Sequence, residues 1–149
     1  MKTGFILILL SLSFVCFSQE MEDPVKWSFE SEKMADDQYK IKFIAEVESG
    51  WAIYSQYNEE GGPIPTTFQL EENSDLLLIG EVVEPDDKEK KYDDMFEMDV
   101  IKLKGNVEFY QIVKTAVSGV SLKGYVTFMC CDDTQCLPPT DVEFEIYID

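Results

Sequence analysis

The chain has 149 residues, of which 30 are acidic and 12 are basic, and it contains no histidine. Its formal net charge of −18 at pH 7 argues against binding to nucleic acid or to anionic membrane surfaces, since both are negatively charged. Without histidine, a Ser-His-Asp triad, a Cys-His pair and a histidine-ligated zinc site are all excluded.

The N-terminus has the pattern of a secretory signal. One lysine precedes a short apolar run that ends at a small residue, which predicts cleavage after residues 1–18. Lipid anchoring at Cys16 is disfavoured, because Val15 stands where a small residue is expected before a lipidated cysteine. We therefore expect residues 19–149 to form a single exported domain without direct membrane insertion. Such a compartment permits disulfides.

Alternation of apolar and polar residues is the dominant pattern of this domain. It is clearest at 39–47 and 142–149, where every second residue is apolar, as in half-buried β-strands. Weaker strand runs are predicted at 25–30, 51–56, 66–71, 78–84, 98–105, 106–114 and 121–130. Turn signals separate these runs, and no helical pattern competes with them. Short strands at this spacing predict an all-β fold, an antiparallel sandwich or barrel of immunoglobulin-like size.

One charged segment breaks the strand rhythm. Residues 84–97, EPDDKEKKYDDMFE, carry Tyr92, Met95 and Phe96 among many charged neighbours. Two interpretations remain open: a solvated surface loop, or a lid that brings aromatic side chains over a site.

Three cysteines lie close together in the stretch FMCCDDTQCLPPT, residues 128–140. Metal binding by these cysteines with Asp132 or Asp133 is disfavoured, because Cys130 and Cys131 are adjacent and point to opposite faces of an extended strand. We therefore expect no metal and no cofactor here. The remaining chemistry is that of thiols and disulfides.

The strand pattern also bears on which cysteines pair. If Phe128 faces the core, Cys130 continues that face and is a buried, inert thiol. Cys131 then faces away at the strand end, and the chain turns back to Cys136. We expect a Cys131–Cys136 bond, with Cys130–Cys136 as the alternative pair. A vicinal Cys130–Cys131 bond would need a distorted peptide.

The bond has a structural and a redox interpretation. A disulfide that closes so short a loop contributes only about 2 kcal/mol in the chain-entropy model, so it is a weak staple. If it is redox-active, Asp132 and Asp133, which line the candidate site, disfavour a nearby thiolate and keep the thiol pKa at or above its free value. Pro138 and Pro139 stiffen the exit from the loop. These features suit a carrier that waits for a specific partner.

These cysteines and their flanks resemble a known family. The segment GYVTFMCCDDTQCLPPTDVEFEI (124–146), with weaker support from GWAIYSQ (50–56) and GGPIPTTF (61–68), resembles the N-terminal domain of the thiol:disulfide interchange protein DsbD. The resemblance implies an immunoglobulin-like β-sandwich in the periplasm. It also implies that Cys131 and Cys136 exchange disulfides with partner proteins.

The resemblance assigns roles to further residues. Tyr54 matches an aromatic position beside the cysteine pair, and the segment 84–97 occupies the region of a mobile cap loop. Tyr92 and Phe96 are the candidates for the ring that shields the pair. Cys130 is an extra cysteine relative to the family pattern.

The resemblance also implies partners. In the family the domain receives electrons from a thioredoxin-like domain fed through a membrane conduit, and passes them to periplasmic isomerases or to thioredoxins of cytochrome c maturation. Neither module follows in this chain, so we expect a separate donor for this thiol-disulfide oxidoreductase. The alternative is a non-catalytic exported binding or adaptor module with a structural disulfide. A third possibility is a degenerate domain that has lost its activity.

Overall fold

The computed structural model describes residues 23–86 and 88–149. The expected signal sequence and the disfavoured lipid site at Cys16 lie outside the described residues. The described part of the chain consists of strands and connections without any helix. A helix capable of crossing a membrane is accordingly absent from it.

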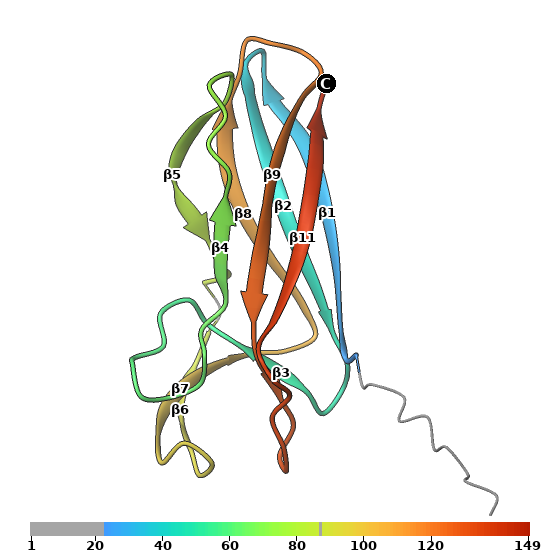
Figure 1. Ribbon diagram of the computed structural model, residues 1–149. Coiled ribbons are helices and arrows are strands. Elements are labelled where there is room, and N and C mark those ends of the chain that lie inside the picture. The colour runs from blue at the N-terminus through green and yellow to red at the C-terminus, as the bar shows by residue number, and fades with distance from the viewer. Residues whose placement is uncertain (1–22, 87) are drawn as a thin grey trace, which may run out of the picture.

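Within the described residues, eleven strands form three antiparallel sheets (Figure 1). They are β1 (Val25–Ala35), β2 (Gln38–Val47), β3 (Ala52–Tyr54), β4 (Thr67–Leu70), β5 (Leu77–Val83), β6 (Lys90–Asp93), β7 (Met98–Leu103), β8 (Asn106–Lys114), β9 (Val120–Phe128), β10 (Cys130–Cys131) and β11 (Thr140–Ile148). The sheet orders are β1-β2-β8-β5, β11-β9-β4 and β10-β3-β7-β6. The first two face each other, which confirms the expected immunoglobulin-like antiparallel β-sandwich.

The main core lies between these two facing sheets. In β2, every second side chain is buried, and Phe43 pairs across the strands with the equally buried Phe109 of β8. The opposite sheet contributes alternate residues such as Leu122 and Ile146. Because period-two burial matches the pleat of a strand, the sequence alternation places these side chains inside. Trp27 adds an aromatic contact to Phe128, with ring centroids 5.5 Å apart.

The small third sheet lies at one end of the sandwich (Figure 1). Its central strand β3 is buried throughout. Ile53 and its cross-strand neighbour Cys130 face the main core, whereas Tyr54 and Cys131 belong to a second, smaller apolar cluster. The two adjacent cysteines are therefore divided between two apolar clusters.

The structure differs from the sequence predictions at two places. The segment 84–97 is not only a loop: it contains β6, which pairs with β7 to form a hairpin. Alternation did not reveal β6, because three of its four residues are exposed. The expected strand 121–130 is interrupted at Met129, where the chain leaves β9 and continues as β10 in another sheet.

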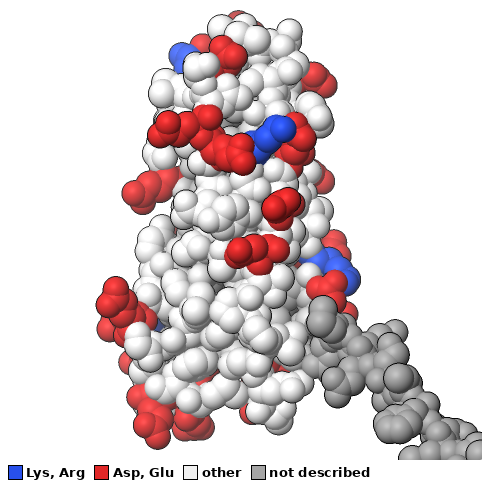
Figure 2. Space-filling model, viewed as in Figure 1, with Lys and Arg blue, Asp and Glu red and all other residues white. Residues whose placement is uncertain are grey.

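The surface is acidic. Figure 2 shows many carboxylate side chains and few lysines on the viewed face. Several lysines pair with carboxylates of neighbouring strands, as Lys40 does with Glu108 at 2.8 Å and Lys123 with Glu145 at 3.1 Å. With 30 acidic residues and 12 basic ones, one-to-one pairing leaves a large excess of negative charge.

Candidate disulfide site at the end of the sandwich

A disulfide joins Cys131 to Cys136. Cys131 is in β10, and the chain returns to it through an isolated antiparallel bridge at Cys136, with 4.1 Å between the two Cα atoms. The structure thus contains the expected pairing, and the alternative Cys130–Cys136 pairing is wrong. Cys130 is a free, buried thiol.

Asp132 shapes the loop between the paired cysteines. Its carboxylate accepts hydrogen bonds from the backbone N–H groups of Thr134 and Gln135, both at 2.7 Å, and from the Thr134 hydroxyl at 2.9 Å. These hydrogen bonds, led by that from the Thr134 N–H, lower the pKa of Asp132. Asp133 is exposed. The two aspartates therefore differ, since Asp132 holds a tight turn and Asp133 faces solvent.

The three cysteines have different surroundings. Cys130 is 4% exposed in the main core, and burial, with a smaller effect from the charge of Asp23, raises its pKa to about 11. Cys131 is 3% exposed. Cys136 is only partly buried. A molecule approaching from solvent therefore meets the sulfur of Cys136 before that of Cys131.

Tyr54 lies beneath the disulfide. It is fully buried in the second cluster with Val100, Met129 and Cys131. Burial, with smaller effects from Asp93 and Cys130, raises the pKa of Tyr54 far above its ordinary value. The phenol thus stays neutral, and its hydroxyl has no hydrogen-bond partner among the described residues. Tyr54 therefore acts as apolar packing next to Cys131.

The turn of the β6–β7 hairpin covers the site. The Met95 sulfur is 3.2 Å from the Cys136 sulfur. The Phe96 ring packs edge-on against Tyr54, with centroids 5.7 Å apart. Tyr92 is 63% exposed and lies outside the second cluster. The structure therefore brings Phe96 to the cysteine pair, leaves Tyr92 largely exposed to solvent, and adds Met95, which was not among the predicted site residues.

A buried carboxylate holds this turn in place. One oxygen of Asp93 accepts hydrogen bonds from the N–H groups of Met95 (2.8 Å) and Phe96 (3.3 Å), and the other pairs with Lys102 at 2.7 Å. The side chain of Asp93 is only 5% exposed. Burial alone would raise the pKa of Asp93, but Lys102 and the two N–H groups outweigh it and lower the pKa. The charged carboxylate thus fixes the cap, which we define as Met95 and Phe96.

A second buried carboxylate anchors the segment that leads into the hairpin. Glu84 accepts hydrogen bonds from the Ser55 hydroxyl (2.5 Å) and the Gln56 N–H (2.8 Å), and it pairs with Lys88 at 2.8 Å. Ser55 and Gln56 directly follow β3, which carries Tyr54. Glu84 therefore ties the root of the hairpin to the strand beneath the disulfide.

Among residues 23–86 and 88–149, no group of three or more cysteine, aspartate or glutamate side chains is placed to hold a metal ion. The disulfide itself offers the chemistry of reduction and re-formation of one bond. The bond joins the sulfur of the half-buried Cys136 to that of the buried Cys131, under a cap of Met95 and Phe96.

Comparison with known proteins supports the fold assignment. No protein-family model and no curated protein sequence matches the chain. The solved DsbD N-terminal domain of Neisseria meningitidis, in its reduced form, aligns with a TM-score of 0.53 and 21% identity, covering 83% of this chain and 86% of that one. The N-terminal periplasmic domain of ScsB from Proteus mirabilis aligns with a TM-score of 0.56 and 18% identity, covering 87% of this chain and 48% of that one. The chain therefore has the fold of a DsbD N-terminal domain.

Proposed function

We propose that this protein is an exported, periplasmic thiol-disulfide oxidoreductase that carries two electrons through the Cys131–Cys136 pair. The observation that carries the proposal is the disulfide itself: it closes a short loop at the end of the sandwich, beneath a cap and away from the main core. The fold shared with DsbD N-terminal domains supports it.

The difference in burial between the two cysteines suggests an order of events. In the reduced protein, the Cys136 thiolate attacks a partner's disulfide, forming a mixed disulfide and releasing one partner thiolate. The Cys131 thiolate then attacks the Cys136 sulfur, which closes the intramolecular bond and releases the second partner thiolate. The partner gains two electrons and this protein loses two. The reverse sequence, with a dithiol donor, reloads the pair.

The proposal also includes the proteins with which this protein exchanges electrons. The sequence resemblance favours a thioredoxin-like donor or acceptor, with a separate membrane conduit as the source of electrons. The signal pattern at residues 1–18 supports export. Recognition of the partner must depend on local features near the disulfide, because a net charge of −18 does not distinguish one neutral partner from another.

The test is a redox titration of the mature protein in glutathione and dithiothreitol buffers, with alkylation and mass mapping of residues 128–140. We expect a reversible Cys131–Cys136 couple at a potential above about −300 mV, the range in which exchangeable rather than structural disulfides lie. A bond that stays closed below that potential would favour the adaptor module instead. In that case, a variant lacking both cysteines would still bind its partner.

A further inference from the structure

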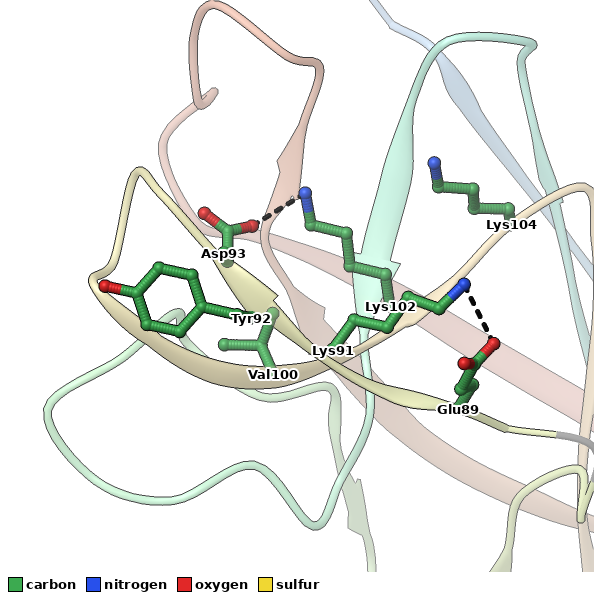
Figure 3. A pocket seen from close by; sticks show the side chains of 7 residues that line it. All are labelled: Glu89, Lys91, Tyr92, Asp93, Val100, Lys102 and Lys104. Carbon is green, nitrogen blue, oxygen red and sulfur yellow. Dashed lines mark ion pairs between the residues drawn. The ribbon is translucent and has the colours of Figure 1, made fainter.

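A pocket of about 500 Å³ borders the hairpin that carries the cap (Figure 3). Its lining consists of Glu89, Lys91, Tyr92, Asp93, Val100, Lys102 and Lys104. These residues come from β6, from β7 and from the residues flanking them. The pocket therefore lies on the small sheet that also carries Cys131 and Tyr54.

The pocket is locally positive in an acidic protein. It gathers three of the chain's 12 basic residues, against two acidic ones. Lys91 pairs with Glu89 at 2.8 Å, and both side chains are at least 70% exposed, so water weakens that pair. Figure 3 shows the ammonium group of Lys104 apart from both ion pairs. The pocket thus offers cationic groups to an incoming anion.

Asp93 connects the pocket to the disulfide. One of its oxygens pairs with Lys102 in the pocket, and the other holds the backbone of Met95 and Phe96. Met95 in turn contacts the Cys136 sulfur. Lys102 is also the cross-strand neighbour of Tyr54. A single carboxylate therefore links Lys102 to the cap.

Building on the proposed function, we propose that this pocket binds an acidic side chain of the protein that exchanges disulfides with Cys136, and that this binding loosens the cap. A carboxylate that attracts Lys102 leaves Asp93 charged, buried and without its cationic partner, which is costly. Asp93 relieves that cost by moving toward water, and the N–H groups of Met95 and Phe96 lose their acceptor. Docking and uncapping are thereby coupled.

The exposed surface around the pocket fits a protein partner. Tyr92 and Met95 are 63% and 44% exposed, and they present an aromatic ring and a thioether beside the cationic groups. A protein can cover these side chains while it places a carboxylate in the pocket and a cysteine at Cys136. A free acid small enough to enter the pocket makes only the first of these contacts.

Two synthetic dithiol peptides test the proposal. Both carry a Cys-x-x-Cys motif; one has glutamates on its flanks and the other has glutamines at the same positions. We expect the glutamate peptide to reduce Cys131–Cys136 about two- to fivefold faster at low salt, the effect of one favourable exposed ion pair, although the protein as a whole repels it. The difference should vanish at about 0.5 M salt. Equal rates, or a faster glutamine peptide, would overturn the proposal.

Lysine variants test whether the pocket causes the preference for the glutamate peptide. Lys104→Gln and Lys91→Gln should abolish the preference for the glutamate peptide. Lys114→Gln removes the same charge at the far end of β8 and should retain it. If Lys114→Gln reduces the preference as much as the pocket variants do, the effect belongs to total charge and the pocket proposal fails. Reduction by dithiothreitol distinguishes failure of the pocket proposal from failure of the proposed function. If dithiothreitol reduces the bond but the protein shows no preference between the peptides, only the pocket proposal is overturned. If dithiothreitol does not reduce the bond, both proposals are overturned.

Discussion

Among single residues, Cys130 is the one whose role the sequence left most open. The structure places its thiol in the main core, on the same face of the small sheet as its cross-strand neighbour Ile53. Cys131, one residue further, faces the second cluster. Exchange between Cys130 and the disulfide would require the side chain to leave the main core. We therefore assign Cys130 to packing.

This assignment predicts the thiol reactivity of the oxidised protein. Because burial raises the pKa of Cys130 from 9.0 to about 11, the thiol should resist alkylation at pH 8 in the folded state and react after unfolding. The raised pKa also means that its contribution to stability is present below pH 9 and is lost as the pH rises toward 11. Iodoacetamide labelling with mass mapping measures the reactivity, and urea unfolding at several pH values measures the contribution to stability. A Cys130→Ala variant that alters the reduction potential of Cys131–Cys136 would contradict the assignment.

Asp93 gives a second prediction for a single residue. Asp93→Asn keeps an acceptor for the cap but loses the charge that pairs with Lys102, a charge-assisted contact worth about 1.5 to 3 kcal/mol. We expect faster reduction of the disulfide by a neutral phosphine, because the cap opens more often. Asp94→Asn, at the exposed neighbouring carboxylate, is the matched control. The lowered pKa of Asp93 further predicts that the cap is stable at neutral pH and loosens as the pH falls below about 4.

Equal rates for the Asp93→Asn and Asp94→Asn variants at neutral pH would show that Asp93 does not hold the cap. The comparison is informative because both substitutions remove one negative charge from the same turn. Only Asp93 is buried and bonded to the backbone of Met95 and Phe96.

At the scale of whole elements, the long strands were predictable and the hairpin that carries the cap was not. Residues 39–47 and 142–149 show the clearest alternation, and they form β2 and most of β11. Strand β6 escaped prediction, although β7 did not, because the hairpin is held by tertiary contacts such as that of Asp93 with Lys102 and turns at Glu97 with a φ of 53°. Neither feature produces a periodic pattern of apolar residues in the sequence.

The same reasoning explains the outcome at the site. The Cys131–Cys136 pairing could be predicted from local sequence, because the two residues are five positions apart. Which aromatic residue reaches the disulfide depends on the face of the hairpin. Tyr92 and Phe96 were therefore indistinguishable before the register of β6 on β7 was known. Met95 was hidden because a thioether among charges resembles an ordinary surface residue.

The pairing of β4 with β9 depends on Gly124. A Cβ atom at this position would lie 2.1 Å from the backbone oxygen of Gln69 and 3.0 Å from the ring of Phe144. Gly124→Ala should therefore push the strands apart and lower the free energy of unfolding by about 2 to 4 kcal/mol. Gly105→Ala, in open space at a φ of 69°, is the control, with an expected cost of about 1 kcal/mol. Urea unfolding compares the two, and equal losses would contradict the close approach.

For the whole molecule, the separation of the main core from the disulfide cluster determines what the bond can contribute. The sandwich core draws on residues from Val25 to Ile148 and includes neither Cys131 nor Cys136. The disulfide closes a loop between residues only five positions apart. Such a loop restricts the unfolded chain little. The fold should therefore persist in both redox states, as a carrier requires.

The last prediction follows from this separation: reduction of the wild-type protein should lower its free energy of unfolding by about 2 kcal/mol, the chain-entropy value for so short a loop. Urea unfolding of the oxidised and reduced forms measures the difference directly, without any substitution. The cooperativity of the transition should be the same in both, because the main core unfolds as before. A loss of about 5 kcal/mol or more, or an unfolded reduced protein, would identify the bond as a structural staple and remove the basis for electron transfer. A small loss would leave the reduced protein folded, with the Cys136 thiol beneath Met95 and Phe96, as the proposed carrier role requires.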